Sequence, residues 1–355
     1  MTISYQNSPP KLPLRLFLLI LLISTPIYAK NLEGISLYAK SELGFETNIF
    51  EQQDNDQPVL CDLFWLGFAH KYYSRNQYLN INLNSSLSCY NNYQTENKTL
   101  HVLSLNHSFI GQRHIVIQSD LQVFNKQWYN NNHGYSNNLV STSIGLSYPK
   151  IQTLLGVQYQ FNNFKTLAEF TSDQSTVFWH LCHSSSAAKI TSLRLAWNYI
   201  RYAERTVFQS STSDSLSHLL QKDECLFLQL GHEFRGKAIG GISLRYLIVH
   251  SNSRFSSFQA ASIRLFNTQK IGQTYIQLIL EGQVKQYSEK NAQFFRFNNP
   301  DPEQNIQDQI LLGMERPIGQ HIALQGKIAF IKNETIYSNQ YYLKWFVATG
   351  ITYRL

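Results

Sequence analysis

The sequence predicts an all-β fold, namely an up-and-down antiparallel transmembrane β-barrel of about 16 strands. Three observations predict it: an alternation of apolar and polar residues along most of the chain, connections that alternate between short and long, and an export signal at the N-terminus. Side chains on a strand point alternately to its two faces. A strand with one apolar and one polar face therefore fits a wall between lipid and a polar interior.

The first 29 residues have the parts of a signal peptide. Lys11 and Arg15 form a basic region, a short apolar run follows, and Ala29 is a small residue before the expected cleavage. The apolar run is shorter than the roughly 20 residues that a spanning helix needs, which disfavours the alternative of an N-terminal anchor helix. We therefore expect a signal peptide, 1–29, and one barrel domain, 30–355.

The composition suits a membrane barrel better than a nucleic-acid-binding protein. The chain has 21 Tyr, 22 Phe and 5 Trp but only 15% charged residues, as aromatic girdles and an uncharged polar lumen require. Its mean hydropathy of −0.27 is compatible with a membrane, because lipid-facing and lumen-facing residues average out. The net charge of +7 is scattered rather than clustered, so we expect no nucleic-acid partner.

The alternation is clear within single segments: Leu193 and Leu195, for example, flank Arg194. Segments of this kind have the length that a tilted strand needs to cross a bilayer. The predicted strands are 35–49, 62–74, 77–90, 99–111, 114–125, 138–149, 151–163, 175–184, 190–202, 225–236, 238–250, 258–268, 274–287, 307–316, 321–332 and 341–355.

The connections between these strands alternate in length, from a turn at Arg75-Asn76 to a link as long as 203–224. A barrel with both termini in the periplasm produces this pattern, with short periplasmic turns and long external loops. The alternative, a secreted all-β adhesin or sandwich, has no reason to sort its loops in this way.

The last strand runs to the terminal carboxylate and ends in Gly350, Tyr353 and Leu355. This spacing resembles the C-terminal signal of Gram-negative outer-membrane barrels. The resemblance implies a location in the cell outer membrane among its lipids and lipopolysaccharide, and recognition by the barrel assembly machinery. Residues 43–50 also resemble the opening strand of the barrel in surface lipoprotein assembly modifiers, which implies a secretion-helper role as an alternative.

Strand parity predicts a polar inner face that carries more bases than acids. Inward arginines either pair with acids to hold the wall or line a water-filled path, and a barrel of this size has room for one. We predict a porin-like channel for small polar solutes with a weak anion preference; the alternative is a surface interaction or secretion-helper barrel without an open pore. The oligomeric state stays open. The predicted inner bases are Arg194, Arg235, Arg245, Arg264, Lys327, Lys344 and Arg354, and the predicted inner acids are Asp120, Glu233, Glu281 and Glu315.

No catalytic or metal-binding set stands out. We find no G-x-S-x-G motif and no Ser–His–Asp grouping, so we expect no enzyme. His180 and Cys182 share a face but His183 lies on the other, which makes a three-ligand metal site poor. We therefore expect no metal and no cofactor.

Two long connections have residue patterns that suggest a structure or a contact of their own. Leu216, Leu219 and Leu220 have helical spacing, so a short amphipathic helix could narrow the lumen or lie over the barrel mouth. The aromatic residues of 294–297 could contact a sugar or a partner, or pack against the rim.

An exported protein with four cysteines can form disulfides, so the positions of these residues matter. The tight turn at 75–76 pairs residues whose numbers sum to about 151, so we predict that Cys61 and Cys89 lie side by side and can form a disulfide. A slip of one residue would turn them to opposite faces. Cys182 and Cys225 lie at opposite ends of their strands and should not meet.

Overall fold

The computed structural model describes residues 34–49, 57–129, 134–165, 168–207, 219–253, 256–288, 308–334 and 341–355. The predicted signal peptide 1–29, Leu216 of the predicted loop helix and the aromatic segment 294–297 lie outside these residues. In the part of the chain that is described, no helix is both long enough and apolar enough to cross a membrane.

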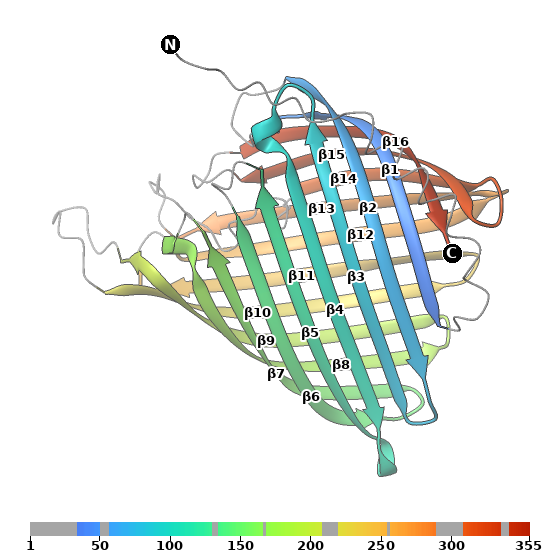
Figure 1. The fold of residues 1–355 in the computed structure, drawn as a ribbon. Coiled ribbons are helices and arrows are strands. Elements are labelled where there is room, and N and C mark those ends of the chain that lie inside the picture. Colours follow the sequence, from blue (N-terminus) through green and yellow to red (C-terminus); the bar gives the residue numbers. More distant parts are fainter. Residues whose placement is uncertain are drawn as a thin grey trace.

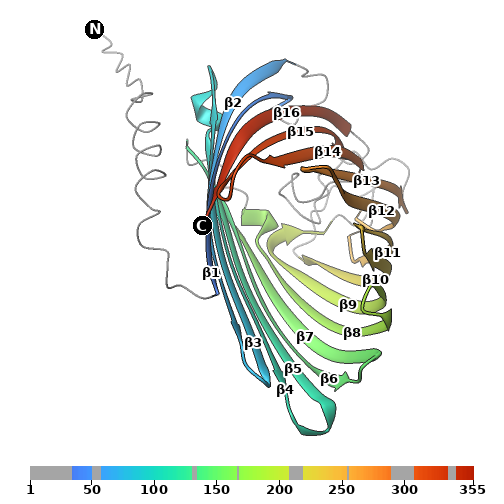
Figure 2. The same ribbon diagram turned by 90° about the vertical axis from the view of Figure 1, so that its right-hand side faces the viewer.

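Sixteen antiparallel strands form one closed barrel (Figures 1 and 2). Each strand pairs with its neighbours in the chain, and β1 pairs with β16 to close the wall. The predicted fold is therefore confirmed. The strands are β1 (Ile35–Thr47), β2 (Pro58–Tyr73), β3 (Gln77–Tyr90), β4 (Lys98–Ile110), β5 (Ile115–Trp128), β6 (Tyr135–Ser147), β7 (Ile151–Phe164), β8 (Ser172–Ser186), β9 (Lys189–Thr206), β10 (Leu220–Arg235), β11 (Ala238–Ser251), β12 (Phe258–Ile271), β13 (Thr274–Tyr287), β14 (Asp308–Pro317), β15 (Ile322–Glu334) and β16 (Tyr341–Arg354), with short 3₁₀ turns η3 (Gln94–Glu96), η4 (Gln112–His114) and η5 (Ala168–Phe170).

The connections confirm the predicted alternation in length. At one end of the barrel, the short-turn end, the links are 74–76, 111–114, 148–150, 187–188, 236–237, 272–273 and 318–321. At the other end, the long-segment end, the strands are separated by 48–57, 91–97, 129–134, 165–171, 207–219, 252–257, 288–307 and 335–340. The tight link 272–273 contains Gly272 at a φ of +60°, a conformation that glycine adopts without steric cost.

Strand β10 begins five residues earlier than predicted. The predicted loop helix with Leu216, Leu219 and Leu220 is therefore wrong at its C-terminal end. Leu220 is already in the strand, so the helix cannot include it. Gln221 and Asp223 face inward and are almost fully buried. Gln221 donates hydrogen bonds to the Asp223 carboxylate, and the Tyr202 hydroxyl also donates to it, at 3.1 Å. The hydropathy pattern missed this extension because both faces of the segment are polar.

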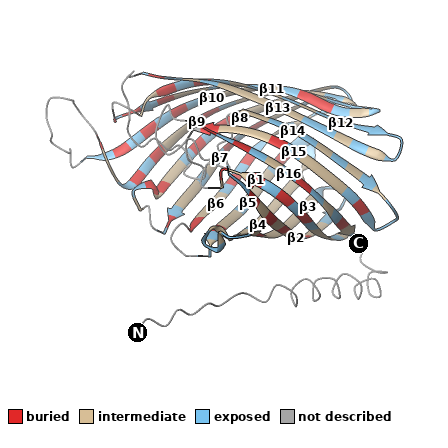
Figure 3. Cartoon of the chain, turned by 90° about the horizontal axis from the view of Figure 1, so that it is seen from above, coloured by how far each residue is buried: buried red, intermediate tan, exposed pale blue. Residues whose placement is uncertain are grey.

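The barrel has an apolar outer wall and a polar inner wall. Leu195 and Leu244, on the outer wall, expose 39% and 47% of their surface, and exposed and buried residues alternate along many strands (Figure 3). On the other wall, Arg354 of β16 reaches Glu315 of β14 across the intervening β15. Side chains converge in this way on the concave side, so the polar wall is the inner one.

Buried apolar side chains gather on the inner wall near the long-segment end. They form three clusters: Ile200, Tyr202, Cys225, Val249, Phe258, Ala260 and Tyr287; Val59, Cys61, Leu63 and Tyr90; and Tyr135, Phe164 and Phe170. The hydrophobic core therefore lies inside one end of the barrel, and the polar inner wall extends from there toward the short-turn end.

The predicted disulfide between Cys61 and Cys89 is wrong. Cys61 lies opposite Tyr90 and Cys89 lies opposite Asp62, so paired residue numbers sum to 151 and the two thiols face opposite walls. Cys182 and Cys225 do not meet, because β9 separates their strands. All four cysteines are free.

Candidate functional site: the inner wall of the barrel

The inner wall carries a ladder of arginines over β9 to β12. Arg194 lies opposite Gln229, and Gln229 lies opposite Arg245 on its other side. Arg264 follows on β12, opposite Glu281 of β13. Directly opposed residues of antiparallel strands share a face. We call Arg194, Arg245 and Arg264 the arginine ladder.

One carboxylate serves two of these arginines. Arg245 Nη1 lies 3.5 Å from Glu281 Oε1, and Arg264 Nε lies 3.7 Å from Oε2. Gln309 also donates to this carboxylate, at 3.4 Å. The Glu281 side chain is 10% exposed, whereas those of Arg245 and Arg264 are 36% and 38% exposed. The positive groups therefore face the interior more openly than the negative one.

Arg194 adds a third positive charge to the ladder. Its guanidinium stacks over the Phe178 ring at 4.7 Å, a favourable cation–π contact that leaves the charge in place. Among the described residues it forms no ion pair. The Nε atoms of all three ladder arginines are buried without a hydrogen-bond partner. The ladder thus holds three guanidiniums against one carboxylate.

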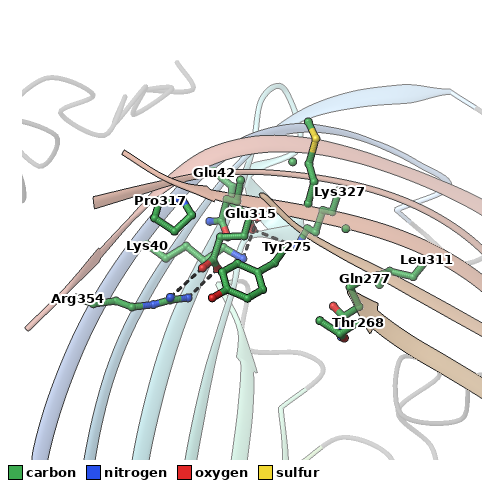
Figure 4. A pocket seen from close by; sticks show the side chains of 14 residues that line it. Lys40, Glu42, Thr268, Tyr275, Gln277, Leu311, Glu315, Pro317, Lys327 and Arg354 are labelled. Atoms are coloured by element: carbon green, nitrogen blue, oxygen red, sulfur yellow. Dashed lines mark hydrogen bonds and ion pairs between the residues drawn. The ribbon is translucent and has the colours of Figure 1, made fainter. Parts of the chain in front are cut away.

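A second charged group lies near the short-turn end, where β14, β15, β16 and β1 meet (Figure 4). Glu42 is 2% exposed and pairs with two lysines, Lys40 at 2.9 Å and Lys327 at 3.1 Å. Arg354 makes a two-point contact with Glu315, at 2.8 and 2.7 Å. Lys40 and Glu42 are both on β1, whereas Glu42 with Lys327 and Arg354 with Glu315 join strands that are not adjacent and so tie the closing seam of the barrel.

The same residues line a cavity of about 560 Å³ on the inner wall. Tyr275, Gln277 and Thr268 complete its polar lining (Figure 4). The cavity opens to the barrel interior, and three bases face two acids in it. Like the ladder, it has a small surplus of positive charge.

The remaining predicted bases are paired. Arg235 lies 3.4 Å from Glu233 on its own strand. Lys344 pairs with Glu46 across the seam between β16 and β1. The contact of Lys344 with Glu46 fits the interpretation that inward bases hold the wall, whereas that of Arg235 with Glu233 lies within one strand.

The inner wall of β3 to β7, by contrast, is built mainly from uncharged polar side chains. Asn80 donates to Asn106, at 3.3 Å, and Asn106 donates to one oxygen of Asp120, at 2.8 Å. Ser141 donates to the other Asp120 oxygen, at 3.0 Å. One hydrogen-bonded chain therefore crosses four strands. We call this face the amide arc: Asn80, Asn82, Asn84, Ser104, Asn106, Gln118, Asp120, Gln122, Ser141, Ser143, Gln158, Gln160 and Asn162.

The predicted assembly signal has a local structural account. Gly350 lies opposite Glu42, and a Cβ at this position would approach the Glu42 Cγ to 2.8 Å and a backbone oxygen of β1 to 2.2 Å. Only glycine leaves room there for the buried carboxylate. Tyr353 faces the outer wall, and Leu355 exchanges two backbone hydrogen bonds with Leu37. A role in assembly stays a prediction.

His180 and Cys182 share the inner wall, with Nε2 and Sγ 3.3 Å apart, and His183 faces outward. Among the described residues there is no group of three His, Cys, Asp or Glu side chains that could hold a metal ion.

Sequence reasoning missed Lys40, Glu42 and Glu46. The signal was available, because these residues alternate in β1 with Ser41 and Phe45 in the same period of two.

A closed antiparallel barrel with an apolar outer wall and a polar inner wall is the architecture of outer-membrane β-barrels, and the chain belongs to this architectural class. No family model and no curated protein matches the sequence.

Several solved structures have a similar fold at low sequence identity. In-vitro folded OmpT, an outer-membrane protein of Vibrio cholerae, is 10% identical, with a TM-score of 0.47 over 90% of this chain and 99% of that one. The porin of Rhodopseudomonas blastica, as a triple mutant, is 10% identical, with a TM-score of 0.38 over 90% and 100%. CdiB from Acinetobacter baumannii is 8% identical, with a TM-score of 0.46 over 90% of this chain and 60% of that one.

Proposed function

We propose that the protein is a porin-like channel of the cell outer membrane that passes small polar solutes with a weak preference for anions. The observation that carries the proposal is the arginine ladder, in which Arg245 and Arg264 share the carboxylate of Glu281 and Arg194 adds a third inward guanidinium, stacked on Phe178. Sixteen strands enclose enough space for an aqueous lumen. A positive surplus on a water-filled wall raises the local concentration of anions.

The two interpretations of the inward bases apply to different residues. The pairs of Glu42 with Lys327, and of Arg354 with Glu315, join non-adjacent strands and hold the seam. The side chains of Arg245 and Arg264 are more exposed than the carboxylate that they share. The ladder also contains fewer acidic than basic side chains. The pore role therefore falls on the ladder rather than on the seam. The proposal includes no catalytic step.

Solute entry into proteoliposomes tests the proposal. We expect vesicles that contain the refolded full-length protein to swell in solutions of small neutral sugars, with a rate that falls as the sugar becomes larger. Heat-modifiable mobility on a gel would show that the barrel in those vesicles is folded. Folded protein that admits no sugar would contradict the proposal and favour the alternative, a surface interaction or secretion-helper barrel without an open pore.

The proposed setting is the outer membrane, with its lipids and lipopolysaccharide around the barrel and the barrel assembly machinery as the partner that reads Gly350, Tyr353 and Leu355. Deleting Leu355 should reduce the amount of folded protein in the outer membrane. A matched deletion in the link 236–237, at the same end of the barrel, controls for general damage. Equal losses in the two variants would contradict a role for the terminal signal.

A further inference from the structure

The outer wall of β4 has an unusually narrow apolar zone. Its outward residues include His101 and His107, and between these two only Leu103 and Leu105 face outward. An apolar band on a lipid-facing barrel is about 25 Å tall. At about 3.3 Å per residue and a tilt of about 40°, such a band takes about ten residue steps.

Both histidines must therefore lie within the membrane if β4 faces lipid. The strand runs from Lys98 to Ile110, and every stretch of about ten steps inside it includes both His101 and His107. The distance between the two histidines corresponds to only about 15 Å of membrane thickness. Lipid tails have no group that can satisfy an imidazole. His101 Nδ1 lies 3.0 Å from the hydroxyl of Ser85 on the neighbouring strand β3, so among the described residues it is the His107 imidazole that is left without a hydrogen bond.

Polar outward residues continue on the next two strands. The same arithmetic places Ser119 and Asn125 of β5 within the band. His107 lies opposite Ser119, and Ser119 lies opposite Thr142 of β6. In the part of the chain that the structure describes, these three side chains form no hydrogen bond with one another or with other residues. We call His101, His107, Ser119, Asn125, Asn138 and Thr142 the outer polar patch.

Strand β9, which lies three strands from β6 around the barrel, has the wide apolar outer face expected of a lipid-facing strand. On β9 the outward residues between Thr191 and Arg201 are all apolar or aromatic, and they include Leu195 and Trp197. Ten residue steps separate Thr191 from Arg201, which corresponds to about 25 Å of thickness. The apolar zone of β4, six steps between its two histidines, is therefore narrower than the ten-step zone of β9.

We propose that the outer polar patch is covered by a second copy of this chain. The patch contains no Asp, Glu, Lys or Arg, and imidazole, hydroxyl and amide groups each both donate and accept hydrogen bonds. Such a surface can bind a copy of itself without charge repulsion, as contacts in closed symmetric oligomers require. Its polar groups would gain partners that lipid cannot supply, whereas β9 would stay in contact with lipid. This proposal does not depend on whether the lumen conducts.

Cross-linking in native outer membranes tests the contact. Cys89 is replaced by Ser, which leaves three inward-facing thiols, and Ser119→Cys or Leu244→Cys is then added. With a short bifunctional maleimide, we expect a covalent dimer of this chain from Ser119→Cys at a yield at least tenfold above that of the Leu244→Cys control. A lipid-soluble maleimide should label the Leu244→Cys variant and spare Ser119→Cys.

The mass of the protein in mild detergent completes the test. We expect native mass spectrometry to find an oligomer of the unmodified chain, and Ser119→Trp, which adds bulk to the patch, to shift it to the monomer, with Leu244→Trp unaffected. A monomer with equal lipid labelling at both positions would overturn the proposal. Protection of Ser119→Cys without a cross-linked dimer would also overturn it, because a different protein would then cover the patch.

Discussion

The amide arc and the arginine ladder are two solutions to the same problem, a polar wall inside a barrel. In the amide arc, neutral donors and acceptors satisfy one another, as in the chain from Asn80 through Asn106 to Asp120. In the ladder, Glu281 serves Arg245 and Arg264 together, and Arg194 stacks on the ring of Phe178. The first wall is nearly neutral and the second carries a positive surplus. In the proposed channel, wettability and ion selectivity would therefore be carried by different strands.

The comparison requires that both regions face the lumen, and the largest expected effect tests this. Leu244→Arg, on the outer wall, should lower the free energy of unfolding by about 2–4 kcal/mol if the residue lies near the bilayer midplane. Gln118→Arg, on the inner wall of the amide arc, places the same side chain in water and should cost much less. Urea unfolding in lipid vesicles measures both, and equal losses would contradict the assignment of the walls.

Neutralising the ladder should change ion selectivity more than any change in the amide arc. With Arg194, Arg245 and Arg264 replaced by Gln, we expect the anion-to-cation permeability ratio to fall by about twofold to threefold, because the positive surplus is lost. The control replaces Gln118, Gln122 and Gln158 by Asn and should leave the ratio unchanged. Equal ratios in the two triple variants would remove the ladder from the permeation path.

Glu281→Gln should act in the opposite direction and less strongly. It removes the carboxylate that Arg245 and Arg264 share, so the anion preference should increase. Both arginines are more than a third exposed, so water screens the lost pairs and the stability loss should be about 1 kcal/mol. A reduced anion preference in reversal-potential measurements would show that the ladder charges do not act on permeating ions.

The smallest effect is expected in the amide arc. Asp120 accepts hydrogen bonds from Asn106 and Ser141 on its two oxygens. Asp120→Asn keeps one acceptor and loses the other, so we expect a loss of about 1 kcal/mol in unfolding free energy. Denaturant titration measures it, with Gln122→Asn as the control. An unchanged midpoint would show that the chain of hydrogen bonds contributes little to the wall.

Most of the fold could be predicted from the sequence, because a period of two shows both the strands and their faces. The inward position of Arg194, Arg245 and Arg264 follows from parity alone. The shared use of Glu281 does not, since it depends on which residues oppose each other across β12 and β13. The turns set the register of the strands, but a difference of one residue turns a side chain to the other wall. A difference of this size places Cys61 opposite Tyr90 instead of Cys89.

The extension of β10 shows a second limit. Lys222 and Asp223 are both charged, yet one faces outward and the other is buried on the inner wall. Hydropathy cannot separate them, because the difference lies in their partners rather than in their polarity. The hydrogen bonds that Gln221 and Tyr202 give to Asp223 supply those partners.

The reversal potential of the unmodified protein in a planar bilayer tests most directly whether the barrel is an open channel with a preference for anions. A salt gradient is applied across a membrane that contains single insertions of the folded full-length chain. We expect stepwise conductance with a reversal potential displaced toward that of the anion. The displacement should be modest, because the seam and the amide arc are nearly balanced in charge. Folded protein that gives no steps, or a displacement toward the cation potential, would contradict it.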